Sequence, residues 1–361
     1  RSAMPQIRRN NTTISIMKRN LITFLLIAMS VQIFAWTSPV DIPDVGDARL
    51  RVVAQNAANY LTNFEASNSS CDNQDEFDSK TNKMANAFLA LKADIVAICE
   101  VERNDDILGY IVDAMNSIYG ENVYTYITDG LYAHASAGDY QGLKSGYIYR
   151  SDKVTPQGSN TSPYRSGEYC ARLRIQAFEE NSTHEKFVLS MNHFKAKSSG
   201  SDNGESTRIQ NASYLISKLN NVTSDDDILI MGDLNAYTEE TPIQNLINAG
   251  YEEQLVRFDP TAYTYIYKGT KGILDHAMAN STMAGQITGA RVYHINTAGG
   301  YNYKYSDHDA VLVGLNLGKQ QQGENLDDVS TTAPARKVLR NGQLYIEIDG
   351  QTFTITGIRI R

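Results

Sequence analysis

Strand-like apolar runs alternate with amphipathic helical segments through most of this 361-residue chain. Short apolar or alternating runs predict strands over residues 50–54, 95–99, 124–127, 145–149, 171–178, 186–191, 228–231, 273–279 and 310–315. Apolar residues at helical spacing predict helices over residues 78–91, 107–119, 206–219 and 241–249. This alternation is typical of proteins in which helices cover a buried sheet, so we predict an α/β fold.

The first 35 residues have the pattern of an export signal. Met17, Lys18 and Arg19 precede an apolar run over residues 21–28, and the segment ends on the small residue Ala35. The alternative is a membrane anchor, but the apolar run is short for a membrane-spanning helix, which needs about 20 apolar residues. We predict upstream residues and a signal peptide over residues 1–35, no transmembrane segment in the mature chain, and a secreted or cell-surface bacterial protein.

The mature chain is expected to be strongly acidic. Residues 1–35 contain five basic residues and no acidic ones, so their removal changes the formal net charge from −8 to −13. This charge argues against a passive nucleic-acid-binding protein, because the phosphate backbone attracts Lys and Arg. It does not exclude an enzyme with a local basic groove and bound divalent cations.

The chain has three cysteines. Cys99 lies within a predicted strand, and we expect it to be a small core residue. Export permits a disulfide between Cys71 and Cys170, and free thiols are the alternative, because spacing alone does not determine pairing.

The C-terminal part of the chain differs in composition from the part before it. Residues 318–335 are polar and predict a linker, and residues 336–361 contain two hairpin turn pairs, Asn341-Gly342 and Asp349-Gly350, between alternating apolar residues. So short a β module buries little core by itself. We predict a small β tail that docks elsewhere or serves as a sorting segment for attachment to the cell surface.

Polar residues follow the ends of several predicted strands. They are found in Gln55-Asn56, Cys99-Glu100, Asn192-His193-Phe194-Lys195, Gly232-Asp233-Leu234-Asn235 and Ser306-Asp307-His308-Asp309. Ligand sites in α/β sheets form beyond the strand ends. Carboxylates and amides suit a hard cation, and an imidazole can transfer protons near neutral pH. Together they predict metal-assisted hydrolysis of a phosphate ester.

With Gly272-Ile273-Leu274-Asp275-His276, the order of these motifs over residues 48–317 resembles the endonuclease/exonuclease/phosphatase superfamily. The segments 263–269, 294–296 and 306–315 are similar to its secreted bacterial nuclease branch. The resemblance implies a catalytic domain over residues 45–317, built as a four-layer sandwich of two packed mixed β-sheets flanked by helices. It also implies a site at one rim of the sandwich.

The resemblance implies that Glu100 and Asp307 bind the metal. Mg²⁺ is expected, with Mn²⁺ as the alternative. Asn56 would support the metal or the scissile phosphate, although Asn is also a common turn residue. The acidic stretches 72–78 and 224–227 could hold structural Ca²⁺, or be ordinary solvated and capping carboxylates.

The remaining predicted catalytic residues manage protons and the attacking water. His308 is the expected general base or transition-state partner, and Asp275 would orient its imidazole. Asp233 and Asn235 would position the water and a phosphate oxygen. Whether His308 or Asp233 takes the proton is left open, because the titrations of neighbouring groups can be coupled.

Cationic residues near these motifs are expected to stabilise the phosphate. His193 would donate to a phosphate oxygen or to the leaving group, and Lys195, Lys197 and Arg172 would add positive charge. Surface solvation or a structural ion pair is the ordinary alternative for these three. His276 directly follows Asp275 in a predicted strand, so its side chain should point to the opposite face of the sheet, away from the site.

Together these features predict a secreted, divalent-metal-dependent nuclease that acts on DNA or RNA with low sequence specificity, since contacts to the backbone carry no sequence information. Nucleic acid would be its substrate, and no stable protein partner is expected. One alternative is a phosphatase or lipid phosphodiesterase on the same fold, of the inositol-phosphate phosphatase or sphingomyelinase type. The other is a non-catalytic surface-binding module.

Overall fold

The structure is a computed structural model that describes residues 36–104, 106–128, 142–197, 201–318, 336–340, 343–348, 351–354 and 359–360. The predicted signal peptide (1–35) and nearly all of the predicted linker (319–335) lie outside the described residues. Within the described ranges, no helix has the length and apolar character needed to cross a membrane.

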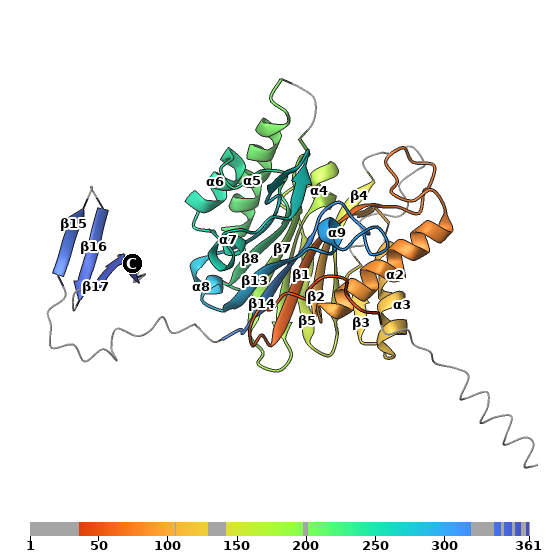
Figure 1. The fold of residues 1–361 in the computed structure, drawn as a ribbon, viewed down its shortest axis with the longest axis horizontal. Helices are drawn as coiled ribbons and strands as arrows, with labels where there is room; N and C mark the ends of the chain where they lie inside the picture. The colour runs from red at the N-terminus through yellow and green to blue at the C-terminus, as the bar shows by residue number, and fades with distance from the viewer. Residues whose placement is uncertain are drawn as a thin grey trace, which may run out of the picture. The chain divides into compact units, whose positions relative to one another are not determined.

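Two six-stranded mixed sheets form the centre of the fold (Figure 1). The first has the order β13 (Ile287–Tyr293), β14 (Ala310–Leu315), β1 (Leu50–Tyr60), β2 (Ile95–Glu102), β4 (Leu143–Arg150) and β3 (Tyr124–Tyr126). The second has the order β5 (Val154–Thr161), β6 (Leu173–Glu180), β7 (Lys186–His193), β8 (Ile228–Asp233), β12 (Asp275–Ala279) and β9 (Glu252–Glu253). The pairs β1–β2 and β7–β8 are parallel, and the other pairs are antiparallel.

Helices cover the outer faces of this sandwich, as Figure 1 shows. Two long helices, α2 (Gln74–Ala90) and α3 (Ile107–Tyr119), lie beside the first sheet, and α5 (Glu205–Leu219) and α6 (Thr241–Asn248) lie beside the second. Shorter helices occur in the connections: α4 (Glu168–Arg172), α7 (Gln254–Phe258), α8 (Ser281–Ala284) and α9 (Ile295–Ala298). The predicted α/β fold of two packed mixed sheets flanked by helices is therefore confirmed.

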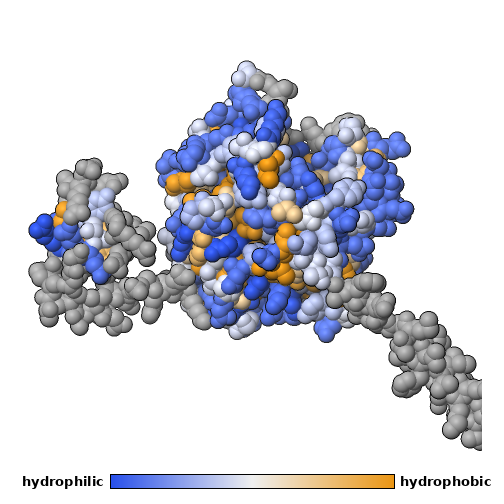
Figure 2. Space-filling view, viewed as in Figure 1, coloured by the Kyte–Doolittle hydropathy of each residue, from blue (hydrophilic) through white to orange (hydrophobic). Residues whose placement is uncertain are grey.

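The strand pattern explains why the layers pack. Alternate residues of a strand point to opposite faces, so Leu189 and Met191 of β7 pack into the core between the sheets, while Val188 packs under α5. Val52 and Tyr147 join the core between the sheets from the first sheet. The visible face of the molecule is largely hydrophilic with small separate apolar patches (Figure 2), as expected when most large apolar side chains are inside.

Tyr147 also connects the two sheets by hydrogen bonds. Its ring lies on β4 of the first sheet and is fully buried. Its hydroxyl oxygen lies 2.7 Å from the carbonyl oxygen of Arg174 and 3.0 Å from that of Leu189, and it accepts a hydrogen bond from the Met191 N–H at 3.0 Å. One side chain of the first sheet thus contacts the main chain of β6 and β7 in the second.

Several details differ from the sequence-based expectations. The helix predicted from residue 78 begins at Gln74, because the side chain of Asn73 caps it by accepting the Glu76 N–H at 3.0 Å. Residues Glu168–Arg172 form α4 rather than the start of a strand, and β6 begins only at Leu173. The strands β5 and β13 were not predicted.

The pairing of Cys71 with Cys170 was left open from the sequence. In the structure all three cysteines are free.

The C-terminal residues form a small sheet of their own. Its four strands pair in sequence order and are antiparallel: β15 (Arg336–Arg340), β16 (Gln343–Ile348), β17 (Gln351–Thr354) and β18 (Arg359–Ile360). A further hairpin joins β10 (Tyr265–Tyr267) to β11 (Thr270–Gly272) in the segment between β9 and β12. The C-terminal β tail is as expected, and its role as a sorting segment stays a prediction.

Candidate active site

The polar residues predicted from the motifs meet where the two sheets present the carboxyl ends of their parallel strands. The first sheet and the loop before β14 contribute Asn56, Glu100 and His308, and the second sheet contributes His193, Asp233 and Asp275. The carboxyl ends of parallel strands form ligand sites in α/β proteins. The site is therefore shared between the sheets.

Local irregularities of the backbone direct these side chains. Glu100 has φ of 56° and Asn235 has φ of 50°, in the left-handed region that such residues rarely adopt. The register of β2 against β4 shifts between Ile98 and Val101, on either side of Glu100. Backbone conformations of this kind cost of order 1–3 kcal/mol each and are concentrated at functional sites.

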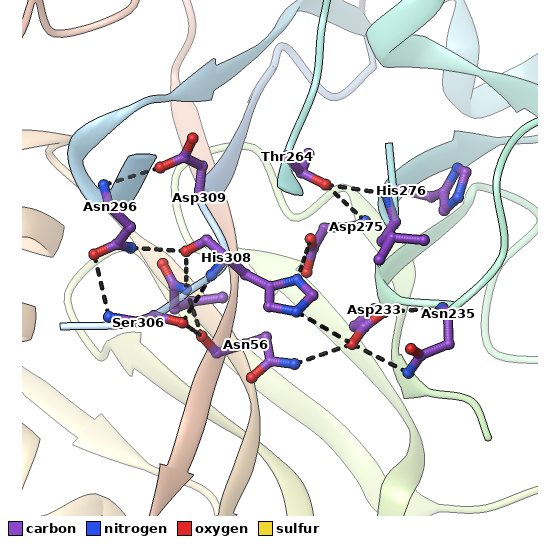
Figure 3. Close-up of polar contacts among 12 residues, drawn as sticks. Asn56, Asp233, Asn235, Thr264, Asp275, His276, Asn296, Ser306, His308 and Asp309 are labelled. Carbon is purple, nitrogen blue, oxygen red and sulfur yellow. Dashed lines mark hydrogen bonds and ion pairs between the residues drawn. The ribbon is translucent and has the colours of Figure 1, made fainter. Parts of the chain in front are cut away.

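His308 is held by a buried carboxylate. Its Nδ1 atom lies 2.7 Å from Asp275 Oδ2, and Asp275 in turn is fixed through its main-chain N–H, which donates to Thr264 Oγ1 at 3.0 Å (Figure 3). The Tyr265 ring covers the imidazole with centroids 4.6 Å apart. Asp275 and His308 are 1 % and 6 % exposed, respectively, so the pair is almost completely removed from solvent.

These neighbours determine the charge of His308. Burial alone would lower the pKa of the imidazole, but the carboxylates of Asp275 and Asp233 outweigh burial and hold that pKa well above its ordinary value. The site therefore favours the imidazolium form.

Asp233 accepts hydrogen bonds from two asparagines. The Asn56 and Asn235 amide nitrogens donate to its Oδ2 at 3.0 and 3.2 Å, and the Asn235 main-chain N–H donates to its Oδ1 at 2.9 Å (Figure 3). His308 Nε2 lies 3.9 Å from the same Oδ2. Burial raises the pKa of Asp233 to about 7, with Asp275 and Glu100 adding to the rise and His308 opposing it.

Asn56 lies between two carboxylates that belong to different sheets. Its amide nitrogen donates to Glu100 Oε1 at 2.9 Å as well as to Asp233, while its Oδ1 accepts the Ala58 N–H at 2.8 Å. Glu100 Oε2 accepts the Asn59 N–H at 3.0 Å. In this arrangement Asn56 presents its amide nitrogen to the carboxylates, and its predicted role as a metal ligand stays a prediction.

His193 approaches both of these carboxylates. Its Nε2 atom lies 3.3 Å from Glu100 Oε1 and 3.9 Å from Asp233 Oδ2. Burial lowers its pKa well below the ordinary value, and the positive charges of Arg172, His308 and Lys195 lower it further. His193 is thus expected to be neutral where His308 is cationic.

The carboxylates and imidazoles form two groups that suit a cation. Glu100, His193 and Asp233 place their ligand atoms within 4.8 Å of one another, and so do Asp233, Asp275 and His308. The exposed Asp307 lines a pocket of about 710 Å³ together with Glu100. Carboxylate oxygens on this scale fit a hard divalent ion.

The acidic stretches predicted as alternative Ca²⁺ sites contribute to neither group. Instead, Glu76 Oε2 accepts the Asp72 N–H at 2.9 Å, and Asp225 Oδ1 accepts the Asp227 N–H at 2.8 Å. These are the capping contacts that the ordinary interpretation expects.

The predicted phosphate-binding cations lie in different settings. Lys195 and Arg172 are close enough to His193 to influence its pKa. Lys197 instead binds Glu240 at 2.6 Å and lies over the Tyr237 ring, which is a structural ion pair. His276 is fully buried away from the site, between Glu253 and the Ala236 carbonyl, as its position on the strand predicted (Figure 3).

A supporting network was missed by reasoning from sequence. Asp309 accepts the N–H groups of Asn296 and Thr297 at 2.9 and 3.0 Å, at the start of α9. The Asn296 amide nitrogen donates to the His308 carbonyl at 2.7 Å, and Ser306 Oγ donates to the Asn56 carbonyl at 2.6 Å (Figure 3). The segment 294–296 was noted only for its resemblance to a nuclease branch, and its contacts give it a structural role.

Comparisons with known proteins identify the family and the fold. A model of the Endonuclease/Exonuclease/phosphatase family matches residues 57–341. No curated protein matches the sequence.

Several solved structures share the fold. An endonuclease/exonuclease/phosphatase from Bacteroides vulgatus is 16% identical with a TM-score of 0.54, covering 74% of this chain and 98% of its own. A mannosyl-6-phosphatase from Bacteroides thetaiotaomicron is 15% identical with a TM-score of 0.54, covering 74% and 100%. The human Nocturnin catalytic domain with bound sulfate is 14% identical with a TM-score of 0.50, covering 74% and 94%.

At these identities the solved structures establish the fold alone, whereas the family model covers well over half of the chain. The chain therefore belongs to the Endonuclease/Exonuclease/phosphatase family, whose members hydrolyse phosphoester bonds.

Proposed function

We propose that this chain is a secreted, divalent-metal-dependent phosphodiesterase that hydrolyses nucleic acid with low sequence specificity. One observation carries the proposal: two sheets place Glu100 and His193 3.3 Å apart, with Asp233 and the His308–Asp275 pair beside them. This set combines ligands for a hard cation with groups that can orient water and transfer a proton.

The metal site would be formed by Glu100 and Asp307, with Asn56 in support. A bound divalent ion supplies positive charge to the phosphate oxygens as the ester is cleaved. The two carboxylates differ in mobility, since Glu100 is fixed by Asn56 and Asn59 whereas Asp307 is exposed at the edge of the pocket.

Proton transfer is assigned to Asp233 and His308. Asp233 has a pKa of about 7 and is fixed by three donated hydrogen bonds, so its ionised form can accept a proton from water near neutral pH. His308 has a raised pKa, and its imidazolium can stabilise negative charge on the phosphate. The neutral His193 would donate a hydrogen bond to a phosphate oxygen.

The surface beside His308 supports nucleic acid over lipid as substrate. On the β10–β11 hairpin, Ile266 and Tyr267 are 37% and 53% exposed. On and beside this hairpin, Lys268 lies over the Tyr267 ring at 5.2 Å and Lys271 lies over the Tyr263 ring at 4.0 Å. Aromatic rings combined with cations suit bases and phosphates.

A phosphomonoesterase is the second candidate. The open pocket of about 710 Å³ beside Glu100 and Asp307 favours it, because a compact phosphorylated sugar would fit such a space. One structural neighbour is a mannosyl-6-phosphatase, which raises the same possibility for this chain.

A substrate panel tests both functions. The purified protein with Mg²⁺ is incubated with plasmid DNA, RNA, mannose 6-phosphate, an inositol phosphate and sphingomyelin, and each reaction is repeated in EDTA. We expect DNA or RNA to be cleaved and EDTA to stop cleavage. Turnover of the phosphorylated sugar alone would support the phosphatase, and undiminished turnover in EDTA would refute metal dependence.

Two variants test whether the measured activity comes from this site or from a contaminating enzyme. We expect His308→Ala to lower kcat by about 10²-fold or more, because acid–base and electrostatic groups contribute on this scale. His184→Ala is the control, since that imidazole is exposed and contacts only Glu179 among the described residues. Equal activity of the two variants would contradict the assignment, as would hydrolysis of none of the substrates.

A further inference from the structure

A pocket beside the predicted metal site is lined by three segments of the chain. It is bounded by the loop after β1, by one face of α2 and by residues 301–307. Glu100 and Asp307 stand at this boundary, so any molecule in the pocket lies next to the atoms that would be cleaved. The catalytic roles described above use none of the lysines in its lining.

Acidic and basic side chains of the pocket lie at different heights along helix α2. Asp75 and Glu76 belong to its first turn, and Lys80 and Lys83 follow on the same face. Lys83 lies seven positions after Glu76, which corresponds to about 10 Å along a helix. Lys304 joins the lining from the loop before β14, so the pocket has three lysines besides its carboxylates.

Lys80 and Lys83 join the helix to the two loops of the pocket. The buried Lys80 ammonium donates to the Ala58 carbonyl at 2.9 Å and to Ser70 Oγ at 2.6 Å. Lys83 is only half-buried and reaches the Lys304 carbonyl at 3.3 Å, with a longer contact of 3.5 Å to the Tyr301 carbonyl. Lys80 therefore builds the floor, whereas the Lys83 and Lys304 ammonium groups lie where a ligand can meet them.

Tyr301 completes the basic end of the pocket. Its side chain is 89% exposed, and Lys83 Nζ lies 5.7 Å from the centre of its ring. An exposed ring beside the Lys83 ammonium offers a base a surface for stacking, and Lys304 in the same lining offers a phosphate a second partner.

We propose that this pocket binds the nucleotide next to the scissile bond, with Lys83 and Lys304 holding the neighbouring phosphate of the strand. The inference rests on the proposed phosphodiesterase function and adds a requirement for a second phosphate. The protein would then act poorly on an isolated diester and well on one with a phosphate on the pocket side.

Dinucleotides that differ by one phosphate test this requirement. The substrates are TpT, pTpT and TpTp, and kcat/KM is measured for each with Mg²⁺. We expect one of the two phosphorylated dinucleotides to be hydrolysed at least tenfold more efficiently than TpT. Equal efficiency for all three would overturn the proposal and leave the phosphodiesterase function intact.

Variants locate the effect. Lys83→Met and Lys304→Met should each reduce the ratio of kcat/KM between the preferred dinucleotide and TpT by about threefold or more. Lys304 is included because its exposed ammonium makes no contact that the fold requires among the described residues. Lys153→Met removes an exposed lysine at the β4–β5 turn and should leave the ratio unchanged. An unchanged ratio in both pocket variants would refute the assignment.

A binding measurement keeps the proposal testable if no dinucleotide is cleaved. Thymidine 3′,5′-bisphosphate is titrated into the wild type, Lys304→Met and Lys153→Met proteins by calorimetry with Mg²⁺. We expect weaker binding by Lys304→Met than by the other two. Absence of hydrolysis with this binding pattern would refute the phosphodiesterase alone, whereas equal binding by all three proteins would refute the pocket.

Discussion

The hydroxyl of Tyr147 provides a direct test of how the two halves of the site are held together. It joins β4 of the first sheet to three main-chain groups of β6 and β7 in the second. In the variant Tyr147→Phe, the ring and its edge-on packing against Phe178, with centroids 5.7 Å apart, are retained. Only the polar link between the sheets is removed.

The magnitude follows from the burial of these groups. Tyr147 is fully buried, so water cannot replace its hydroxyl without rearrangement of the core. Leaving a buried polar group without its partner costs about 1–3 kcal/mol. We therefore expect the free energy of unfolding to fall by about 2 kcal/mol, which lowers Tm by roughly 3–4 °C in a domain of about 270 residues.

The assay is urea denaturation and differential scanning calorimetry, with Tyr149→Phe as the matched control. Tyr149 lies two residues along the same strand and packs on the same Phe178 ring at 6.1 Å, but its hydroxyl makes no hydrogen bond to the described residues. We expect the control to change stability by less than about 0.5 kcal/mol. Equal losses for Tyr147→Phe and Tyr149→Phe would refute the role given to the hydrogen bonds.

Three further predictions concern charge. Glu180 is buried and accepts two hydrogen bonds of 2.9 Å from Arg49; burial raises the pKa of Glu180, but its hydrogen bonds lower that pKa overall. Glu180→Ala should therefore lower the free energy of unfolding by about 1.5–3 kcal/mol at neutral pH, and urea denaturation should show this difference shrinking as the pH falls below the ordinary pKa of 4.5. Asp275→Asn should lower kcat/KM about tenfold or more and lower the pKa of His308, as a pH–rate profile and a histidine NMR titration would show. Mg²⁺ should raise Tm in a thermal-shift assay, with a smaller rise for Glu100→Gln, since a ligand bound only by the folded state stabilises it.

The site residues at the strand ends could be predicted because each motif is a short segment in which a polar residue stands beside an apolar run. Asp233 ends β8, Asp275 begins β12 and His308 lies two residues before β14, so each polar residue can be recognised beside an apolar run. The parallel pairing of β1 with β2 and of β7 with β8 then brings these ends together. The fold class could therefore be predicted, and so could the fact that these strand-end residues lie close together.

The contacts that orient the site could not be predicted, because they depend on residues far apart in sequence. The amide nitrogen of Asn56 donates hydrogen bonds to Glu100 and Asp233, which lie 44 and 177 residues away in the sequence. Lys197 was an equally good candidate for phosphate as Lys195 until the fold placed Glu240 beside it. The early start of α2 reflects the Asn73 cap, for which Asp78 was an equally acceptable residue type.

The balance of charge at the rim gives a physical reason for the proposed metal dependence that does not rest on motifs. Asp233 and Asp275 are buried and Glu100 is partly buried, whereas the imidazolium of His308 lies 2.7 Å from Asp275 and 3.9 Å from Asp233. Burial, together with the carboxylates of Asp275 and Glu100, raises the pKa of Asp233 to about 7, so a proton on Asp233 compensates part of this excess near neutral pH. A divalent ion beside Glu100 would supply the same compensation, so metal and proton would compete for one site. Binding the ion would leave Asp233 ionised, the form that can accept a proton from water.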